Sequence, residues 1–184
     1  AALKSVVVES VVSGGVSVLN ADDPHTHAMA RYAGGSICYF SMAAGKTKTL
    51  SEHIARSGHA VTREMIGGKM QIVLHKNGLR APIIATDDIP ATYAGAAAFN
   101  VENAIAATAV ASALGIDPHI IRSALGAFTS SFEQNPGRFN VYDGHGFRVI
   151  MDFAHNPAAL TALFRMIRDM RVHHGRVIGN LGIP

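Results

Sequence analysis

The sequence predicts an α/β fold, with a mixed and mostly parallel sheet covered by helices, and two observations lead to it. A short apolar run at 16–19 is followed by a polar loop, a helical segment and a second apolar run at 36–40. That order is typical of parallel α/β sheets. Further along, Asn77-Gly78 separates two runs rich in Val and Ile, which indicates antiparallel strands at the edge of the sheet.

Capping signals and apolar runs place the individual elements. A capping residue followed by proline marks three helix starts, at Asp23-Pro24, Asp117-Pro118 and Asn156-Pro157. A further helix is expected between residue 100 and Gly115, and residues 3–12 are expected to form a short buried helix or a strand. Apolar runs bounded by turn residues predict strands at 16–19, 36–40, 70–74, 79–84, 138–142, 147–152 and 177–180.

Composition excludes several classes of protein. The chain has 184 residues, 48% of them hydrophobic and 16% charged, which excludes a disordered tail. It contains no apolar run of about 18 residues, so we expect no contact with a membrane. The net charge is only +3, from scattered Lys and Arg, so we expect no nucleic-acid partner. The single cysteine, Cys38, allows no internal disulfide, and with no signal peptide at the N-terminus it favours a cytoplasmic location.

A polar loop at 129–136 divides the chain, and we place a domain boundary between residues 133 and 134. The second unit, 134–184, is much shorter than the roughly 100 residues of an ordinary α/β domain. We therefore expect the chain to be part of a larger protein.

The first candidate motif is Asn20-Ala21-Asp22-Asp23, which directly follows an apolar strand. Ligands of α/β sheets bind at the carboxyl ends of parallel strands, so these polar side chains are candidate ligand contacts. The alternative is that they form only a turn and a helix cap.

The second motif contains Asn100 and Asn103, which are three residues apart on a predicted helix and so share one face of it. Two carboxamides can donate and accept hydrogen bonds, as reading the N6 and N7 edge of adenine requires. Alternatively, Asn100 caps the helix and Asn103 faces water.

The third motif is Arg138 after Gly137, close to the domain boundary. A guanidinium at such a junction can bind phosphate oxygens. The alternative is a surface arginine on an interdomain turn.

The fourth motif begins with Asp152, at the end of an apolar strand, and includes His155 in the turn that follows. A carboxylate at this place in nucleotide-binding folds accepts hydrogen bonds from ribose hydroxyls. His155 could pack on a base or contact phosphate. Helix capping explains Asn156 and Pro157 but gives no reason for Asp152.

Two apparent motifs are rejected. Gly45-Lys46-Thr47 resembles the end of a phosphate-binding loop, but Phe40 stands where that loop needs its first glycine. The histidine pairs lack the spacing of metal ligands, so no metal site is predicted at His25 and His27 or at His173 and His174.

Together, and in this order, the motifs resemble those of the Mur ligase superfamily, and within it most of all those of the cyanophycin synthetase family. The matching segments are LNADDP at 19–24, NVENAIAA at 100–107, PGRF at 136–139 and DFAHNP at 152–157. The resemblance implies that residues 1–133 are the C-terminal part of a central ATP-binding domain that lacks its phosphate-binding loop. Residues 134–184 would be the start of a Rossmann-like C-terminal domain.

The activity that this resemblance implies is ATP-dependent amide-bond formation through an acyl phosphate. In the cyanophycin synthetase family the reaction would join arginine to the aspartate side chains of polyaspartate. ATP, Mg²⁺, arginine and a carboxylate acceptor are the implied cofactors and partners. The ligands of Mg²⁺ would lie mostly outside this chain, and a homo-oligomeric state is left open.

The site residues are carried over motif by motif. Asn103, with Asn100, would contact adenine, and Asp152 would hold the ribose. Arg138 would contact phosphate when the domains close, and His155 would lie near the nucleotide. No catalytic residue is assigned, and we expect the chain alone to be inert. The alternatives are another Mur-type ligase, acting on peptidoglycan precursors or folylpolyglutamate, or a non-catalytic module that binds a nucleotide or a partner.

Overall fold

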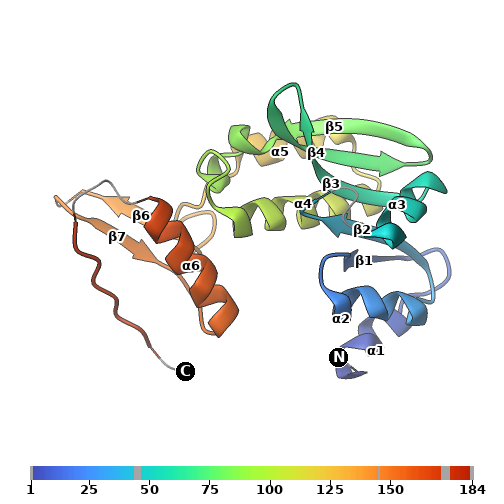
Figure 1. Cartoon of the computed structure of the whole chain (residues 1–184), viewed down its shortest axis with the longest axis horizontal. Coiled ribbons are helices and arrows are strands. Elements are labelled where there is room, and N and C mark those ends of the chain that lie inside the picture. Colours follow the sequence, from blue (N-terminus) through green and yellow to red (C-terminus); the bar gives the residue numbers. More distant parts are fainter. Residues whose placement is uncertain (1, 44–46, 145, 171–174, 183–184) are drawn as a thin grey trace.

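A five-stranded sheet with helices on both faces adjoins a smaller unit of two strands and one helix (Figure 1). The computed structural model describes residues 2–43, 47–144, 146–170 and 175–182. Its α-helices and strands are α1 (Ala2–Glu9), β1 (Val16–Asn20), α2 (Pro24–His27), β2 (Ser36–Ser41), α3 (Lys48–Ala55), β3 (His59–Ile66), β4 (Lys69–Lys76), β5 (Leu79–Ala85), α4 (Ala98–Ala113), α5 (Pro118–Ala127), β6 (Asn140–Asp143), β7 (Arg148–Met151) and α6 (Pro157–Asp169).

The strands of the large sheet lie in chain order, from β1 to β5. The pairings β1–β2 and β2–β3 are parallel, whereas β3–β4 and β4–β5 are antiparallel. The hairpin between β4 and β5 turns at Asn77 and Gly78, whose φ angles are 54° and 76°, as a tight hairpin turn requires. The mixed sheet and its antiparallel edge are therefore as predicted, but the sheet is not mostly parallel, since parallel and antiparallel pairings are equal in number.

Apolar side chains cover both faces of this sheet. On one face, Val101 and Ile105 of α4 pack with Cys38, Val61 and other buried residues of the strands. On the other face, α1, the 3-10 turn Ala28–Tyr32 and α3 cover a second cluster of buried side chains. Burial raises the pKa of the Cys38 thiol to about 12, so this cysteine serves as an apolar core residue.

The smaller unit packs against the N-terminal end of α4 (Figure 1). Strands β6 and β7 pair antiparallel, and α6 follows them. The side chain of Phe139, only 1% exposed, lies between the two units, where its ring makes edge contacts with Tyr93 and Phe99. This packing is what sets α4 and the β7–α6 connection beside each other.

Local signals predicted the helix starts correctly. Asp23, Asp117 and Asn156 each accept a hydrogen bond from a backbone N–H of the helix that they cap. The segment expected to be one helix from Pro24 is a short α2 continued by the 3-10 turn. None of the helices in the described part of the chain has the length and apolar character that a membrane span needs.

Three expectations are corrected. Residues 177–180 are not a strand, because no described strand pairs with them, and Ile178 is 93% exposed. The strand expected from residue 138 begins at Asn140, because Gly137 and Phe139 have positive φ angles and form a turn. Helix α3 was not anticipated. Its cap is Thr47, which accepts a hydrogen bond from the backbone N–H of Leu50.

Candidate functional site

A cavity of about 460 Å³ lies between the N-terminal end of α4 and the segment that connects β7 to α6. The five residues to which the family resemblance gives a nucleotide contact all line it, namely Asn100, Asn103, Arg138, Asp152 and His155. They come from three motifs that are far apart in the chain. The fold therefore brings together two carboxamides, a guanidinium, a carboxylate and an imidazole around one space.

Asn100 and Asn103 lie on α4 and differ in how far the protein already uses them. Helix α4 is capped by Ala97, so Asn100 is not the helix cap. Its Nδ2 donates to the carbonyl of Ala91 at 2.6 Å, and its Oδ1 accepts from Asn103 Nδ2 at 3.4 Å. Asn103 is exposed, and its Oδ1 accepts no hydrogen bond from the described residues. Asn100 thus orients the amide of Asn103, which is the one with bonding capacity left for a ligand.

Asp152 follows β7, and one of its two carboxylate oxygens is engaged within the protein. Oδ2 accepts a hydrogen bond from the backbone N–H of Phe139 at 2.9 Å. This contact joins the end of β7 to the turn that carries Arg138. No described residue donates to Oδ1, which can accept a hydrogen bond from a ligand hydroxyl.

Arg138 has no carboxylate partner among the described residues. Its guanidinium carbon lies 5.0 Å from the centre of the Phe153 ring, a distance at which the cation and the ring attract each other. The positive charge is therefore held in place by an aromatic face and is not neutralised. Such a guanidinium can bind an anion with two parallel hydrogen bonds.

His155 lies next to the same phenylalanine. The imidazole Nδ1 is 3.0 Å from the carbonyl oxygen of Phe153, and the two rings are 5.0 Å apart. Because a carbonyl oxygen can only accept, Nδ1 carries the proton, and Nε2 of the neutral ring is an acceptor. Phe153 thus contacts both Arg138 and His155, although the sequence offered no reason to single it out beyond its place inside the DFAHNP segment.

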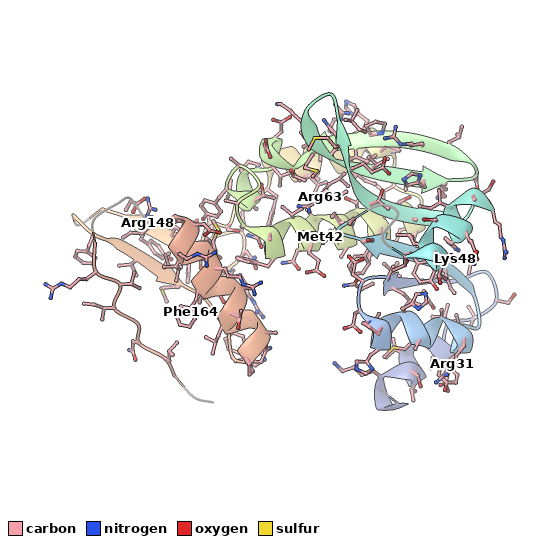
Figure 2. The ribbon with its side chains drawn as sticks, in the orientation of Figure 1. Arg31, Met42, Lys48, Arg63, Arg148 and Phe164 are labelled. Atoms are coloured by element: carbon pink, nitrogen blue, oxygen red, sulfur yellow. The ribbon has the colours of Figure 1, made fainter. Side chains whose placement is uncertain are left out.

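The first motif lies outside this cavity, and its side chains have structural partners. Asp23 caps α2, and Asp22 accepts hydrogen bonds from Ser41 Oγ and the backbone N–H of Met42, each at 2.7 Å. Asn20 donates to Glu102 of α4 at 2.8 Å. The turn-and-cap interpretation accounts for this motif. Nearby, Arg63 Nε donates to the carbonyl of Met42 and ties the loop after β2 to β3 (Figure 2).

A larger cavity, of about 800 Å³, lies between the β6–β7 hairpin, α6 and residues 175–178. Arg148, labelled in Figure 2, and Asp143 line it but bind each other, with Arg148 Nε 2.8 Å from Asp143 Oδ1. None of the motif residues contributes to it. We therefore take the smaller cavity as the candidate site.

No metal site is found among the described residues, since no group of three or more His, Cys, Asp or Glu side chains is placed to hold an ion. The rejected loop residues Gly45 and Lys46 lie outside the described residues, as do His173 and His174.

Comparison with known proteins agrees with the motifs. Residues 137–184 match the family described as Mur ligase, glutamate ligase domain. The chain is 37% identical to the cyanophycin synthetase of Geminocystis herdmanii over 182 residues, which cover 99% of this chain and 20% of that protein. The cyanophycin synthetase of Synechocystis sp. is 36% identical over 184 residues, covering 100% of this chain and 20% of that protein. The resemblance to the Mur ligase superfamily is confirmed.

Other members of the superfamily match shorter parts of the chain. The UDP-N-acetylmuramoyl-L-alanyl-D-glutamate–2,6-diaminopimelate ligase of Syntrophomonas wolfei is 41% identical over 73 residues, which cover 39% of this chain and 14% of that protein. This Mur-ligase-like chain spans about 20% of the length of the cyanophycin synthetases that it matches. The predicted mixed α/β fold class is confirmed by the five-stranded sheet and by the family match.

Proposed function

We propose that this chain supplies the adenine, ribose and phosphate contacts of a nucleotide site in an ATP-dependent ligase that forms amide bonds. The single observation that carries the proposal is the convergence of Asn100, Asn103, Arg138, Asp152 and His155 on one cavity. Its volume, about 460 Å³, lies within the usual range for small-molecule and cofactor pockets.

Each side chain is proposed to meet one part of ATP. Asn103, oriented by Asn100, would bind the N6 and N7 edge of adenine, because a carboxamide can both donate and accept there. Asp152 would accept a hydrogen bond from a ribose hydroxyl through Oδ1, since Oδ2 is held by Phe139. Arg138 would bind phosphate oxygens, and His155 would lie close to the nucleotide.

The proposed reaction has two steps. An acceptor carboxylate oxygen attacks the γ-phosphorus of ATP, which forms an acyl phosphate and releases ADP. An amine then attacks the acyl carbon, forms the amide bond and releases inorganic phosphate. Positioning and charge neutralisation dominate such phosphoryl transfer; Asn103 and Asp152 would contribute to the first and Arg138 to both. The ligands of the Mg²⁺ that accompanies ATP would lie mostly outside this chain.

The substrates are proposed from the relatives. Cyanophycin synthetases match almost the whole chain, so arginine is the proposed amine and the aspartate side chain of a polyaspartate backbone the proposed acceptor. A second candidate is a ligase of peptidoglycan precursors, which the 41% identity to a diaminopimelate ligase over 73 residues favours.

The experiment uses the natural protein that contains these 184 residues, produced at its natural length. ADP release is measured with ATP, Mg²⁺ and one of two acceptors, a polyaspartate primer with free side-chain carboxylates or a UDP-muramoyl peptide, with arginine, lysine, glutamate or diaminopimelate as the amine. We expect ADP release that requires both the primer and arginine. Release only with a UDP-muramoyl acceptor and diaminopimelate would support the second candidate. Absence of ATP binding would contradict both.

A further inference from the structure

We propose that Asn140 is a positioning residue for Arg138: its side-chain amide fixes the turn that carries the guanidinium into the cavity. The proposal rests on the proposed function, which assigns Arg138 to the phosphates of ATP. Neither the sequence motifs nor the cavity lining singled out Asn140, since it follows PGRF and its side chain is 1% exposed.

The backbone around Arg138 needs external support. Gly137 and Phe139, the residues on either side, have φ angles of 72° and 52°. A positive φ is unfavourable for a residue with a side chain, so Phe139 keeps this conformation only because its surroundings impose it. A small change in either φ would turn Arg138 away from its present direction.

The side chain of Asn140 supplies that support by bonding three backbone groups. Its Oδ1 accepts from the N–H of Gly137 at 2.7 Å. Its Nδ2 donates to the carbonyls of Ser130 and Asn135, at 2.8 Å and 3.0 Å. Both hydrogens of Nδ2 and one acceptor site of Oδ1 are thus used. The amide of Asn140 therefore holds Ser130 and Asn135, which lead into the turn, and Gly137 within the turn at fixed positions relative to one another.

Asn140 also has a fixed place relative to the other cavity residues. It is the first residue of β6 and is paired with Met151 of β7, and Asp152 directly follows Met151. Asp152 in turn accepts from the N–H of Phe139. The turn is therefore fastened on both sides of Arg138 to the strand pair from which Asp152 and Phe153 emerge. Phe153 then contacts the guanidinium itself.

Only a carboxamide of this length performs the function. An aspartate would keep the acceptor for Gly137 but lose both donors, and an alanine would lose all three bonds. The buried backbone groups left behind would then lack partners, which favours rearrangement of the turn. The expected defect is a misplaced Arg138, with the base and ribose contacts of the cavity retained.

The test is a double-mutant cycle in the natural-length protein, with the variants Asn140→Ala, Arg138→Ala and the double variant. We expect Arg138→Ala to lower kcat/KM for ATP about 100-fold or more and Asn140→Ala about 10-fold. The double variant should be no worse than Arg138→Ala alone, because Asn140 acts through Arg138. The loss of kcat/KM in Asn140→Ala should arise from kcat and from KM in the same proportion as the loss in Arg138→Ala.

A binding measurement gives a readout independent of turnover. By calorimetry, Asn140→Ala should weaken binding of a non-hydrolysable ATP analogue about 10-fold and leave adenosine binding unchanged. Thr108→Val is the matched control, since Thr108 is a fully buried residue of α4 whose hydroxyl bonds a backbone carbonyl away from the cavity. It should leave all of these values unchanged. If Asn140→Ala does not fold, Asn140→Gln takes its place, since it retains an uncharged carboxamide and changes only the length of the side chain.

The outcomes separate the two proposals. If Arg138→Ala lowers kcat/KM but Asn140→Ala does not, or if the two losses multiply in the double variant, the positioning role of Asn140 is wrong and the proposed function stands. If Arg138→Ala leaves ATP use unchanged, the assignment of Arg138 to phosphate is wrong, and the role of Asn140 falls with it.

Discussion

Arg80 and Arg138 belong to two regions that use a guanidinium in opposite ways. Arg80, on β5, donates to Glu64 Oε2 through Nε at 2.9 Å and Nη2 at 2.6 Å, so its charge is neutralised within the fold. Arg138 faces an aromatic ring and has no ion pair among the described residues. The first arrangement stabilises the antiparallel half of the sheet, whereas the second leaves a cation at a cavity for an anion.

The region around Arg80 is a closed network. Glu64 Oε1 accepts from Thr62 Oγ1 and lies 2.7 Å from His75 Nε2, and Thr62 is fully buried. Burial would raise the pKa of the Glu64 carboxyl, but the hydrogen bonds from Thr62, Arg80 and His75 outweigh it and hold that pKa below 4.5. Charged side chains that satisfy one another in this way are a structural feature and do not by themselves indicate a ligand site.

The strongest test of the contrast is to remove each arginine in turn. Arg138→Ala should lower kcat/KM for ATP by about 100- to 1000-fold, as expected when a guanidinium that binds phosphate is lost. Its thermal stability should change little, because the side chain has no ion pair among the described residues. Steady-state kinetics and a melting curve measure the two effects.

Arg80→Ala is the matched control and should show the reverse: lower stability and unchanged kcat/KM. If both variants lose activity to the same degree, the division between a structural and a ligand-binding guanidinium is wrong.

A second comparison, between contacts local in the chain and contacts made only on folding, separates the features that the sequence predicted from those that it could not. Helix caps such as Asp23, Asp117 and Asn156 were predictable, because a cap depends on groups two or three residues away. Residues 177–180 were wrongly predicted as a strand, because an apolar run forms one only where another strand pairs with it. The amino-acid composition of the run does not show whether such a partner strand is present.

The candidate site likewise contains residues that the sequence could predict and at least one that it could not. Asn103, Arg138, Asp152 and His155 were selected because residue type and motif order identify them. Asn140 was not, because its role depends on the carbonyl of Ser130, ten residues away, and on the backbone conformation of the turn. Such contacts exist only once the chain is folded, so the sequence could name the groups proposed to meet a ligand but not the groups that hold them in place.

The next prediction concerns the carboxylate at the centre of the closed network. Glu64→Gln should lower the free energy of unfolding by about 1–3 kcal/mol, because Arg80 and the buried His75 lose a charged acceptor. Since the folded-state pKa of Glu64 is depressed, its contribution is present above pH 4.5 and is lost as the pH falls through the folded-state pKa. Urea denaturation at several pH values measures this.

Glu52→Gln is the control for Glu64→Gln. Glu52 pairs with Lys48 one helical turn away at 3.7 Å, and both side chains are exposed. Its loss should cost less than about 0.5 kcal/mol. Equal costs for the two variants would mean that the Glu64 network contributes no more than a surface pair.

On the cavity side, the smaller effect is expected from Asn103→Leu. Losing the amide should raise KM for ATP about 10-fold, the typical cost of a lost base contact. The KM for inosine triphosphate, which lacks the N6 amino group, should rise less. An equal rise for both nucleotides would contradict adenine recognition by Asn103, while unchanged kinetics would remove Asn103 from the site altogether.

The smallest effect is expected at His59, in the sheet and away from the cavity. Burial, with the nearby charges of Lys76 and His53, lowers the pKa of His59 to about 4, and the ring bonds Ser112 Oγ at 2.9 Å. Because the unfolded chain takes up this proton near pH 6.5, stability should fall as the pH drops from 6.5 towards 4. The imidazole is partly exposed, so we expect this contribution of His59 to the pH dependence of stability to be under about 1 kcal/mol.

His59→Gln has no such proton, and its melting temperature should fall less than that of the wild type between pH 7 and pH 5. A steeper fall in the variant would mean that His59 is charged in the folded protein, and the sheet would then hold an unneutralised cation of the kind that otherwise lines the cavity.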